Sequence, residues 1–150
     1  MLRVLNRREA LTAGAGAIAA GVGLTARPAL ALNDYADQIK AFTGGKTPAE
    51  GGVRIELPEL AENGNTVPMS VAVDGPMTGG AYVQEIFVVA PANPNARVIR
   101  FRFSPMSVPE AATRIRLAET QDVHAVAKLS DGTFLAASRQ IKVTIGGCGG

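Results

Sequence analysis

The sequence predicts an all-β domain, because short segments in which hydrophobic and polar residues alternate follow one another from residue 53 onward. About seven such segments occur, roughly ten residues apart, with no helical pattern between them. Turn sequences such as Asp74-Gly75-Pro76 and Asp131-Gly132 separate them. This arrangement is typical of an antiparallel β-sandwich of the immunoglobulin-like type.

A short amphipathic helix is expected ahead of the strands. Asn33 is a suitable N-cap, and Tyr35, Ile39 and Phe42 fall on one face at helical spacing. Gly44-Gly45 ends the segment. We expect this apolar face to pack on the sheet, with coverage of a partner's edge as the alternative.

The alternation then sets the expected strands in order. Val53 and Ile55 alternate with charged residues in the first strand, whereas the apolar run from Tyr82 to Ala90 predicts a strand buried on both faces. The segment from Pro58 to Asn65 is rich in turn residues and is expected to form a loop. The expected strands cover residues 53–57, 69–73, 82–90, 99–103, 114–117, 123–129 and 134–145.

Residues 1–31 resemble an export signal. Arg7 and Arg8 are paired in a basic start, a glycine-diluted apolar stretch follows, and Ala29 and Ala31 supply the small residues that a signal peptidase requires. The paired arginines predict twin-arginine export to the periplasm, with cleavage before Leu32. A membrane anchor is the alternative, but a spanning helix needs about 20 apolar residues with few glycines. We therefore expect a signal at 1–31, a sandwich domain at 32–145 and a flexible arm at 146–150, with no membrane attachment after cleavage.

Removal of this leader changes the charge of the protein. The whole chain has 15 basic and 13 acidic side chains, and the leader contains four of the basic ones and one of the acidic ones. The remainder has 11 basic and 12 acidic groups, a net charge of −1. Such a balance removes the compositional support for nucleic-acid binding. One cysteine also excludes an intramolecular disulfide, so the hydrophobic core must stabilise the domain.

The chain ends in Gly146-Gly147-Cys148-Gly149-Gly150, which contains the only cysteine. Glycine loses much conformational entropy on ordering, so this segment is expected to stay mobile and thin enough to enter a narrow cleft. With Val143 as the last held residue, Cys148 would reach about 17 Å beyond the sheet. Nothing in a glycine segment lowers the ordinary thiol pKa, so activation is expected from a partner.

The rest of the chain lacks the residues that catalysis requires. His124 is the only histidine, which excludes a copper site with two histidines and argues against a cysteine protease. No metal site or catalytic residue is expected. Four arginines on two expected strands form a candidate basic stripe, which is either a solvated face or a docking site for an anionic substrate or acidic partner. They are Arg100, Arg102, Arg114 and Arg116.

Three stretches together carry a resemblance to a known family. They are the terminal Gly-Gly-Cys-Gly-Gly, the run Pro58 to Gly64 followed by Val67-Pro68, and the run Thr113 to Ala118 followed by Gln121 and Val123. The sequence resembles SoxY, the sulfur-carrier subunit of the bacterial thiosulfate-oxidising Sox system. The resemblance extends over essentially the whole chain after the leader.

The resemblance implies that Cys148 is the covalent attachment point for sulfur intermediates and that Gly146, Gly147, Gly149 and Gly150 form its arm. It implies a heterodimer with SoxZ. Haem-containing SoxAX would conjugate thiosulfate to the thiol, SoxB would release sulfate by hydrolysis, and a sulfane dehydrogenase, where present, would oxidise the remaining sulfur. The chain itself would be a carrier and no enzyme, and its only bound group would be the sulfur on Cys148.

Two functions of other classes remain open from the sequence. The first is an interaction module whose Cys148 forms an intermolecular disulfide, for example in a linked dimer. The second is a ubiquitin-like sulfur carrier, in which the Gly150 carboxylate becomes a thiocarboxylate. Such carriers act in the cytosol, and the leader argues against that location.

Overall fold

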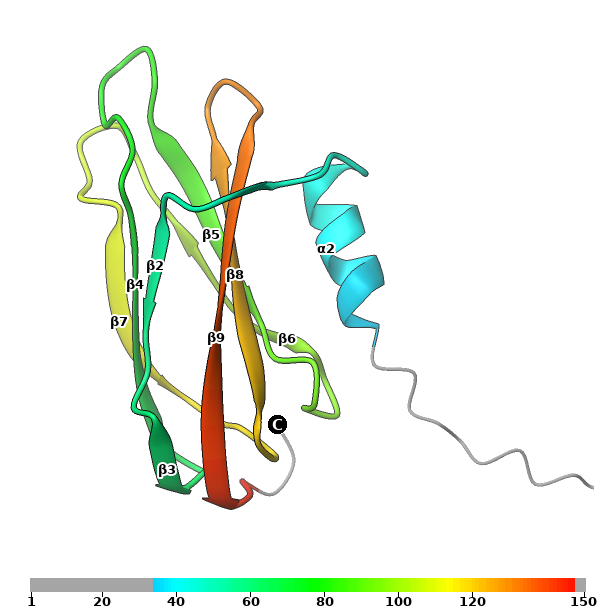
Figure 1. Cartoon of the computed structure of the whole chain (residues 1–150). Coiled ribbons are helices and arrows are strands. Elements are labelled where there is room, and N and C mark those ends of the chain that lie inside the picture. The colour runs from blue at the N-terminus through cyan, green and yellow to red at the C-terminus, as the bar shows by residue number, and fades with distance from the viewer. Residues whose placement is uncertain (1–33, 148–150) are drawn as a thin grey trace, which may run out of the picture. The chain divides into compact units, whose positions relative to one another are not determined.

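The computed structural model describes residues 34–147, which form two packed β-sheets and one helix (Figure 1). The larger sheet has six strands: β1 (Ala49–Glu50), β9 (Phe134–Ile145), β8 (Gln121–Leu129), β5 (Val83–Val89) and β6 (Arg97–Arg102) in this order, with β3 (Leu60–Asn63) also paired to β9. The smaller sheet has the order β2 (Val53–Glu56), β4 (Val67–Val73) and β7 (Glu110–Ile115). The prediction of an immunoglobulin-like sandwich is confirmed.

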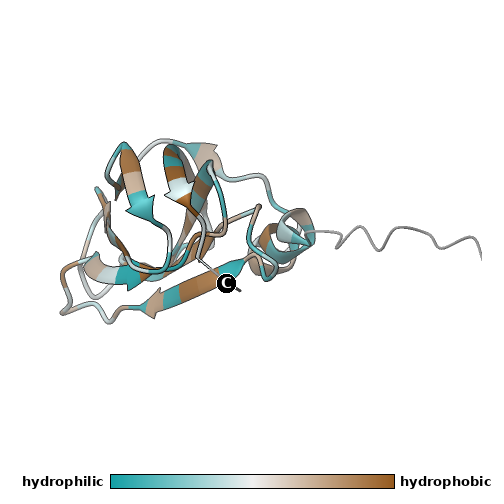
Figure 2. Ribbon diagram, turned by 90° about the horizontal axis from the view of Figure 1, so that it is seen from below, coloured by the Kyte–Doolittle hydropathy of each residue, from teal (hydrophilic) through white to brown (hydrophobic). Residues whose placement is uncertain are grey.

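The core lies between the two sheets and follows from the alternation. In β4, Val67, Met69, Val71 and Val73 are buried while the residues between them are more exposed. Figure 2 shows the strands in two layers, with hydrophobic and hydrophilic residues alternating along them. Because successive side chains of a strand point to opposite faces, each strand contributes every second residue to the core. Within the described residues, no helix is long and apolar enough to cross a membrane.

Two strands were not predicted from the sequence. The expected loop at 58–65 contains β3, which pairs in parallel with β9 through Leu60 and Lys142, and β1 also pairs in parallel with β9. Neither strand has an alternating pattern with a buried face, since β1 is exposed and only Ala61 of β3 is buried. Their pairing with β9, rather than their own sequence pattern, makes them strands. After β1, the chain crosses from the larger sheet to the smaller sheet, where it forms β2. It then returns to the larger sheet as β3, which also pairs with β9.

The predicted helix is present as α2 (Tyr35–Thr43), and its apolar side packs on the larger sheet. The Phe42 ring lies 5.1 Å from the Phe87 ring and 5.8 Å from the Phe134 ring, between centroids. Gly44, at φ 63°, caps the C-terminus. Asn33 lies outside the described residues, and Asp34 occupies the N-cap position.

His124 on β8 is also covered by α2, because its ring stacks on Tyr35 with centroids 5.7 Å apart. Burial lowers the pKa of His124 from its ordinary value, and the nearby Asp122 carboxylate opposes this shift. Loss of hydration disfavours the imidazolium more than one carboxylate stabilises it. His124 is therefore a neutral packing residue at pH 7.

The lowered pKa of His124 predicts a pH-dependent stability. The unfolded chain binds a proton at this histidine near pH 6.5, whereas the folded chain does so only at lower pH, so the free energy of unfolding falls as the pH drops below about 6.5. This contribution is fully present above that pH. Urea unfolding of the wild type and of His124→Gln at pH 7.5 and pH 5.5 should show a smaller pH-dependent loss in the variant. Equal losses would contradict the assignment.

Candidate functional site

The predicted site lies at the C-terminal end of β9. Gly146 and Gly147 belong to the described residues, whereas Cys148, Gly149 and Gly150 lie outside them. The signal residues Arg7, Arg8, Ala29 and Ala31 also lie outside them. The structure therefore shows the base from which Cys148 continues.

Gly147 is buried and held by the backbone of a distant loop. Its N–H donates to the carbonyl of Leu117 at 2.8 Å, and the Leu117 N–H donates to the carbonyl of Gly64 at 2.8 Å. The Gly64 N–H in turn donates to the carbonyl of Ile145 at 2.7 Å. We call this arrangement of Gly64, Leu117 and the segment from Ile145 to Gly147 the glycine clasp. Because buried backbone groups need hydrogen-bond partners, the clasp holds the chain end to the domain.

Gly146 and Gly147, the first two residues of the expected flexible arm, lie against the domain, and Gly147 is hydrogen-bonded to it. The chain is held as far as Gly147 rather than Val143. Only one peptide unit, about 3.8 Å between Cα atoms, separates the last held residue from Cys148, in place of the expected reach of about 17 Å.

Close backbone contact explains why these positions are glycine. A Cβ on Gly64 would lie 2.1 Å from the Leu117 carbonyl oxygen, and one on Gly146 would lie 2.0 Å from that of Ala118. A Cβ on Gly147 would lie 2.8 Å from the Gly64 carbonyl oxygen. All three distances are shorter than Cβ contacts in proteins, and the nearby atoms belong to backbone that a rotamer change does not move. Glycine is therefore required at these positions because backbone carbonyl groups approach them too closely for a side chain.

Two buried polar side chains hold the loop that carries Leu117. Asn93, 4 % exposed, donates from Nδ2 to the Arg116 carbonyl at 2.9 Å, and its Oδ1 accepts from the Ala118 N–H at 2.9 Å. Gln121, 7 % exposed, donates from Nε2 to Asn93 Oδ1 and to the Glu119 carbonyl, each at 3.1 Å. Its Oε1 accepts from the Ala92 N–H at 2.8 Å. These bonds fix the loop on both sides of Leu117.

Sequence reasoning missed most of this base. Asn93 lies in the stretch from Pro91 to Pro94, whose sequence predicts only a turn. The alternating pattern around Leu117 predicts only a buried core residue. Gly64 and Gln121 belong to the stretches that carry the family resemblance, which is the one signal that could have singled them out. No local pattern indicates that Gly64, Leu117 and Gly147 meet, because they are far apart in the chain.

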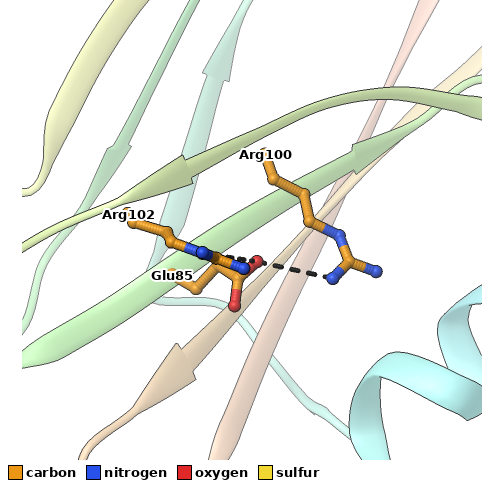
Figure 3. Close-up of polar contacts among 3 residues, drawn as sticks. All are labelled: Glu85, Arg100 and Arg102. Carbon is orange, nitrogen blue, oxygen red and sulfur yellow. Dashed lines mark ion pairs between the residues drawn. The ribbon is translucent and has the colours of Figure 1, made fainter.

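The arginines of the candidate basic stripe come from two different sheets. Arg100 and Arg102 belong to β6 of the larger sheet, whereas Arg114 belongs to β7 of the smaller one. Figure 3 shows Arg100 and Arg102 directed at Glu85, whose Oε1 lies 3.6 and 3.8 Å from their nearest nitrogens. The Arg100 guanidinium also lies 4.4 Å from the centre of the Phe87 ring. These two arginines pack and pair within their own sheet.

The described residues contain no group of three His, Cys, Asp or Glu side chains that could hold a metal ion. At this end of the domain the structure shows a backbone that is held as far as Gly147, the residue before Cys148.

Gly64→Ala tests the clasp directly. The new methyl group would overlap the Leu117 carbonyl, so the clasp must open and the free energy of unfolding should fall by about 1–3 kcal/mol. The Gly147 amide should also exchange its hydrogen faster than in the wild type. Gly79→Ala is the matched control, since nothing lies within 4 Å of a Cβ there. Unchanged stability and exchange in Gly64→Ala would show that the clasp does not hold the chain end.

Comparison with known proteins identifies related chains. The family model of the sulfur oxidation protein SoxY matches residues 39–148. The solved structure of the sulfur carrier protein SoxY from Chlorobium limicola f thiosulfatophilum is 32 % identical, with a TM-score of 0.65, and the match covers 75 % of this chain and 94 % of that one. No curated protein sequence matches the chain.

Other similar structures share the fold at lower identity. A superoxide reductase (neelaredoxin) from Ignicoccus hospitalis is 21 % identical with a TM-score of 0.56, covering 62 % of this chain and 80 % of its own. A putative superoxide reductase from Thermotoga maritima is 20 % identical with a TM-score of 0.55, covering 68 % and 89 %. These two show the sandwich alone. The family match, which includes the position of Cys148, and the SoxY structure decide the identity: the chain belongs to the SoxY family of sulfur-oxidation carrier proteins.

Proposed function

We propose that this protein carries thiosulfate-derived sulfur covalently on Cys148 and presents it to the enzymes of the Sox system. The family match supports this, because it extends to residue 148 and so includes the only cysteine of the chain. The observation that carries the proposal is the clasp, which holds the backbone up to the residue directly before that cysteine.

The chemistry needs only a thiol that other proteins can reach. In the loading step, the sulfur of Cys148 forms a bond to the outer sulfur of thiosulfate, with loss of the thiol proton and of two electrons to the haem of SoxAX. SoxB then adds water to the terminal sulfonate, which leaves as sulfate, and a persulfide stays on Cys148. A sulfane dehydrogenase, where present, oxidises that remaining sulfur. The carrier performs no catalysis and holds no cofactor of its own.

The position of Cys148 directly after the clasp determines how these enzymes approach. Cys148 follows Gly147, the last residue that the clasp holds. An enzyme must therefore come close to the end of the domain that contains Gly64 and Leu117, and the thinness of the glycines that follow lets its active site enclose the thiol. We place this exchange in the periplasm after twin-arginine export, with SoxZ as the partner in a heterodimer.

Cys148→Ser tests the attachment point. Removal of the only thiol should abolish thiosulfate-dependent sulfate release in a reconstituted Sox system, while the melting temperature stays unchanged because residue 148 follows the clasp. Gly150→Ala, which keeps the thiol, is the control and should retain activity. Full activity in Cys148→Ser would refute the proposal. If the serine variant instead loses only a disulfide-linked dimer, the function as an interaction module is favoured.

A two-glycine insertion between Gly147 and Cys148 tests whether position matters more than reach. The insertion leaves the clasp intact but moves the thiol away from its held base, so turnover should fall about tenfold or more because orientation is lost. The same insertion between Gly79 and Gly80, in an exposed turn, is the control. Equal or faster turnover with the lengthened segment would mean that the thiol needs reach alone.

A further inference from the structure

A methionine side chain lies almost entirely in water in the loop between β6 and β7. Met106 is 97 % exposed, more than any other large hydrophobic residue of the described chain. β7 runs from this loop toward Leu117, so the loop and the glycine clasp lie at opposite ends of that strand (Figure 1). The thioether of Met106 is therefore open to small molecules in the solvent, and it lies away from the site described above.

The loop holds Met106 in this position. The Ser107 N–H donates to the Ser104 carbonyl at 2.9 Å, and the Ser104 N–H donates to Ser107 Oγ at 3.1 Å. Pro105 and Pro109 fix the backbone before and after the tip of the loop, since the proline ring restricts φ. The Pro109 carbonyl in turn accepts a hydrogen bond from the backbone of β4 at 3.0 Å. A held turn therefore keeps the side chain outside the core.

The other methionines that the structure describes are shielded. Met69 is 3 % exposed and faces the core from β4. Met77 is partly buried against the core, and its Sδ accepts a hydrogen bond from the Val83 N–H at 3.3 Å. An oxidant has to reach a lone pair of the sulfur, so both sites become reactive only when this part of the domain opens. In the folded protein, Met106 is thus the most accessible thioether among residues 34–147.

We infer that Met106 is a modification site, at which a peroxide converts the thioether to methionine sulfoxide. The sulfur attacks one peroxide oxygen, so an S–O bond forms as the O–O bond breaks. The proton on the transferred oxygen passes to the departing oxygen, which leaves as water or, from an organic peroxide, as an alcohol. The sulfur is oxidised by two electrons and the peroxide is reduced by two. The product belongs to the substrate class of the methionine sulfoxide reductases, which restore the thioether.

The modification changes the surface of the loop and leaves the fold intact. The sulfoxide oxygen at Met106 lies in water, so it needs no hydrogen-bond partner within the protein. Val108, two residues further on, is 72 % exposed, so oxidation makes a previously apolar loop tip polar. The same oxygen at Met69 would enter the core between the sheets without a hydrogen-bond partner and would destabilise the domain. Position in the fold thus makes one methionine tolerant of oxidation and the other intolerant.

The rate of oxidation at each methionine tests this inference. The full chain with Cys148→Ser, which leaves methionine as its only sulfur-containing residue type, is treated with hydrogen peroxide and digested with trypsin at successive times. The peptide of residues 103–114 contains Met106 alone, and fragmentation of the peptide of residues 55–97 separates Met69 from Met77. Met106 should react about tenfold faster or more than either, because their reaction requires opening of the domain. Equal rates, or a slower reaction at Met106, would overturn the inference.

Two controls separate the effect of the fold from that of the local sequence. In urea sufficient to unfold the domain, Met69, Met77 and Met106 should react at similar rates, and a persistent preference for Met106 would contradict the structural explanation. In the folded protein, Met106→Leu should remove the fast reaction and leave the rates at Met69 and Met77 unchanged. Addition of Val108→Met to that variant should restore a fast reaction, because position 108 is also exposed. A slow reaction at position 108 would show that exposure does not decide the rate.

Reversal of the modification and the stability of the modified protein complete the test. The singly oxidised protein should keep the melting temperature of the unoxidised one, and the two epimer-specific methionine sulfoxide reductases with dithiothreitol should return its mass to the starting value. A lowered melting temperature, or a sulfoxide that neither reductase reduces, would contradict the inference. These measurements use a chain without the Cys148 thiol, so their outcome does not depend on the proposed function, and the failure of either proposal leaves the other standing.

Discussion

The hydrogen bond from the Gly147 N–H to the Leu117 carbonyl, at 2.8 Å, determines how this domain presents its C-terminus. It joins the end of the last strand to the loop between the two sheets, and that loop is itself held by the buried side chains of Asn93 and Gln121. A buried backbone donor without a partner would be costly, so each bond in this set depends on the others being formed. A chain end rich in glycine is thereby fixed up to the residue before Cys148.

Much of the fold could be predicted from the sequence, because alternation of buried and exposed residues is a local property of a strand. The sandwich, the helix on the sheet and the Phe42 contact follow from such patterns. The parallel strands β1 and β3 do not, since their pairing with β9 replaces any pattern of their own. The sheet membership of the four arginines could not be predicted for a related reason: alternation tells which residues face outward but not which sheet a strand joins.

The sequence predicts the chemistry of the candidate site, and the structure adds how the residues before Cys148 are held. The lone cysteine and the family resemblance indicate a sulfur attachment point. The four flanking glycines, however, are equally compatible with a mobile segment and with a segment packed closely against other backbone. Only the meeting of Gly64, Leu117 and Gly147 decides between these readings, and that meeting depends on residues far apart in sequence. Gly146 and Gly147 are glycine because carbonyl groups approach them closely. The proposed carrier therefore has a held base directly before its attachment residue, and this base gives several enzymes the same target position.

The intact mass of the protein, followed by fragmentation of the C-terminal peptide, shows whether sulfur is carried on Cys148. After incubation with thiosulfate and its oxidising enzymes, we expect the protein to gain a mass corresponding to thiosulfate or extra sulfur atoms. A reductant should remove this mass, and fragmentation should locate it on Cys148. A protein of unmodified mass, or an adduct on the Gly150 carboxylate, would show that Cys148 does not carry the sulfur.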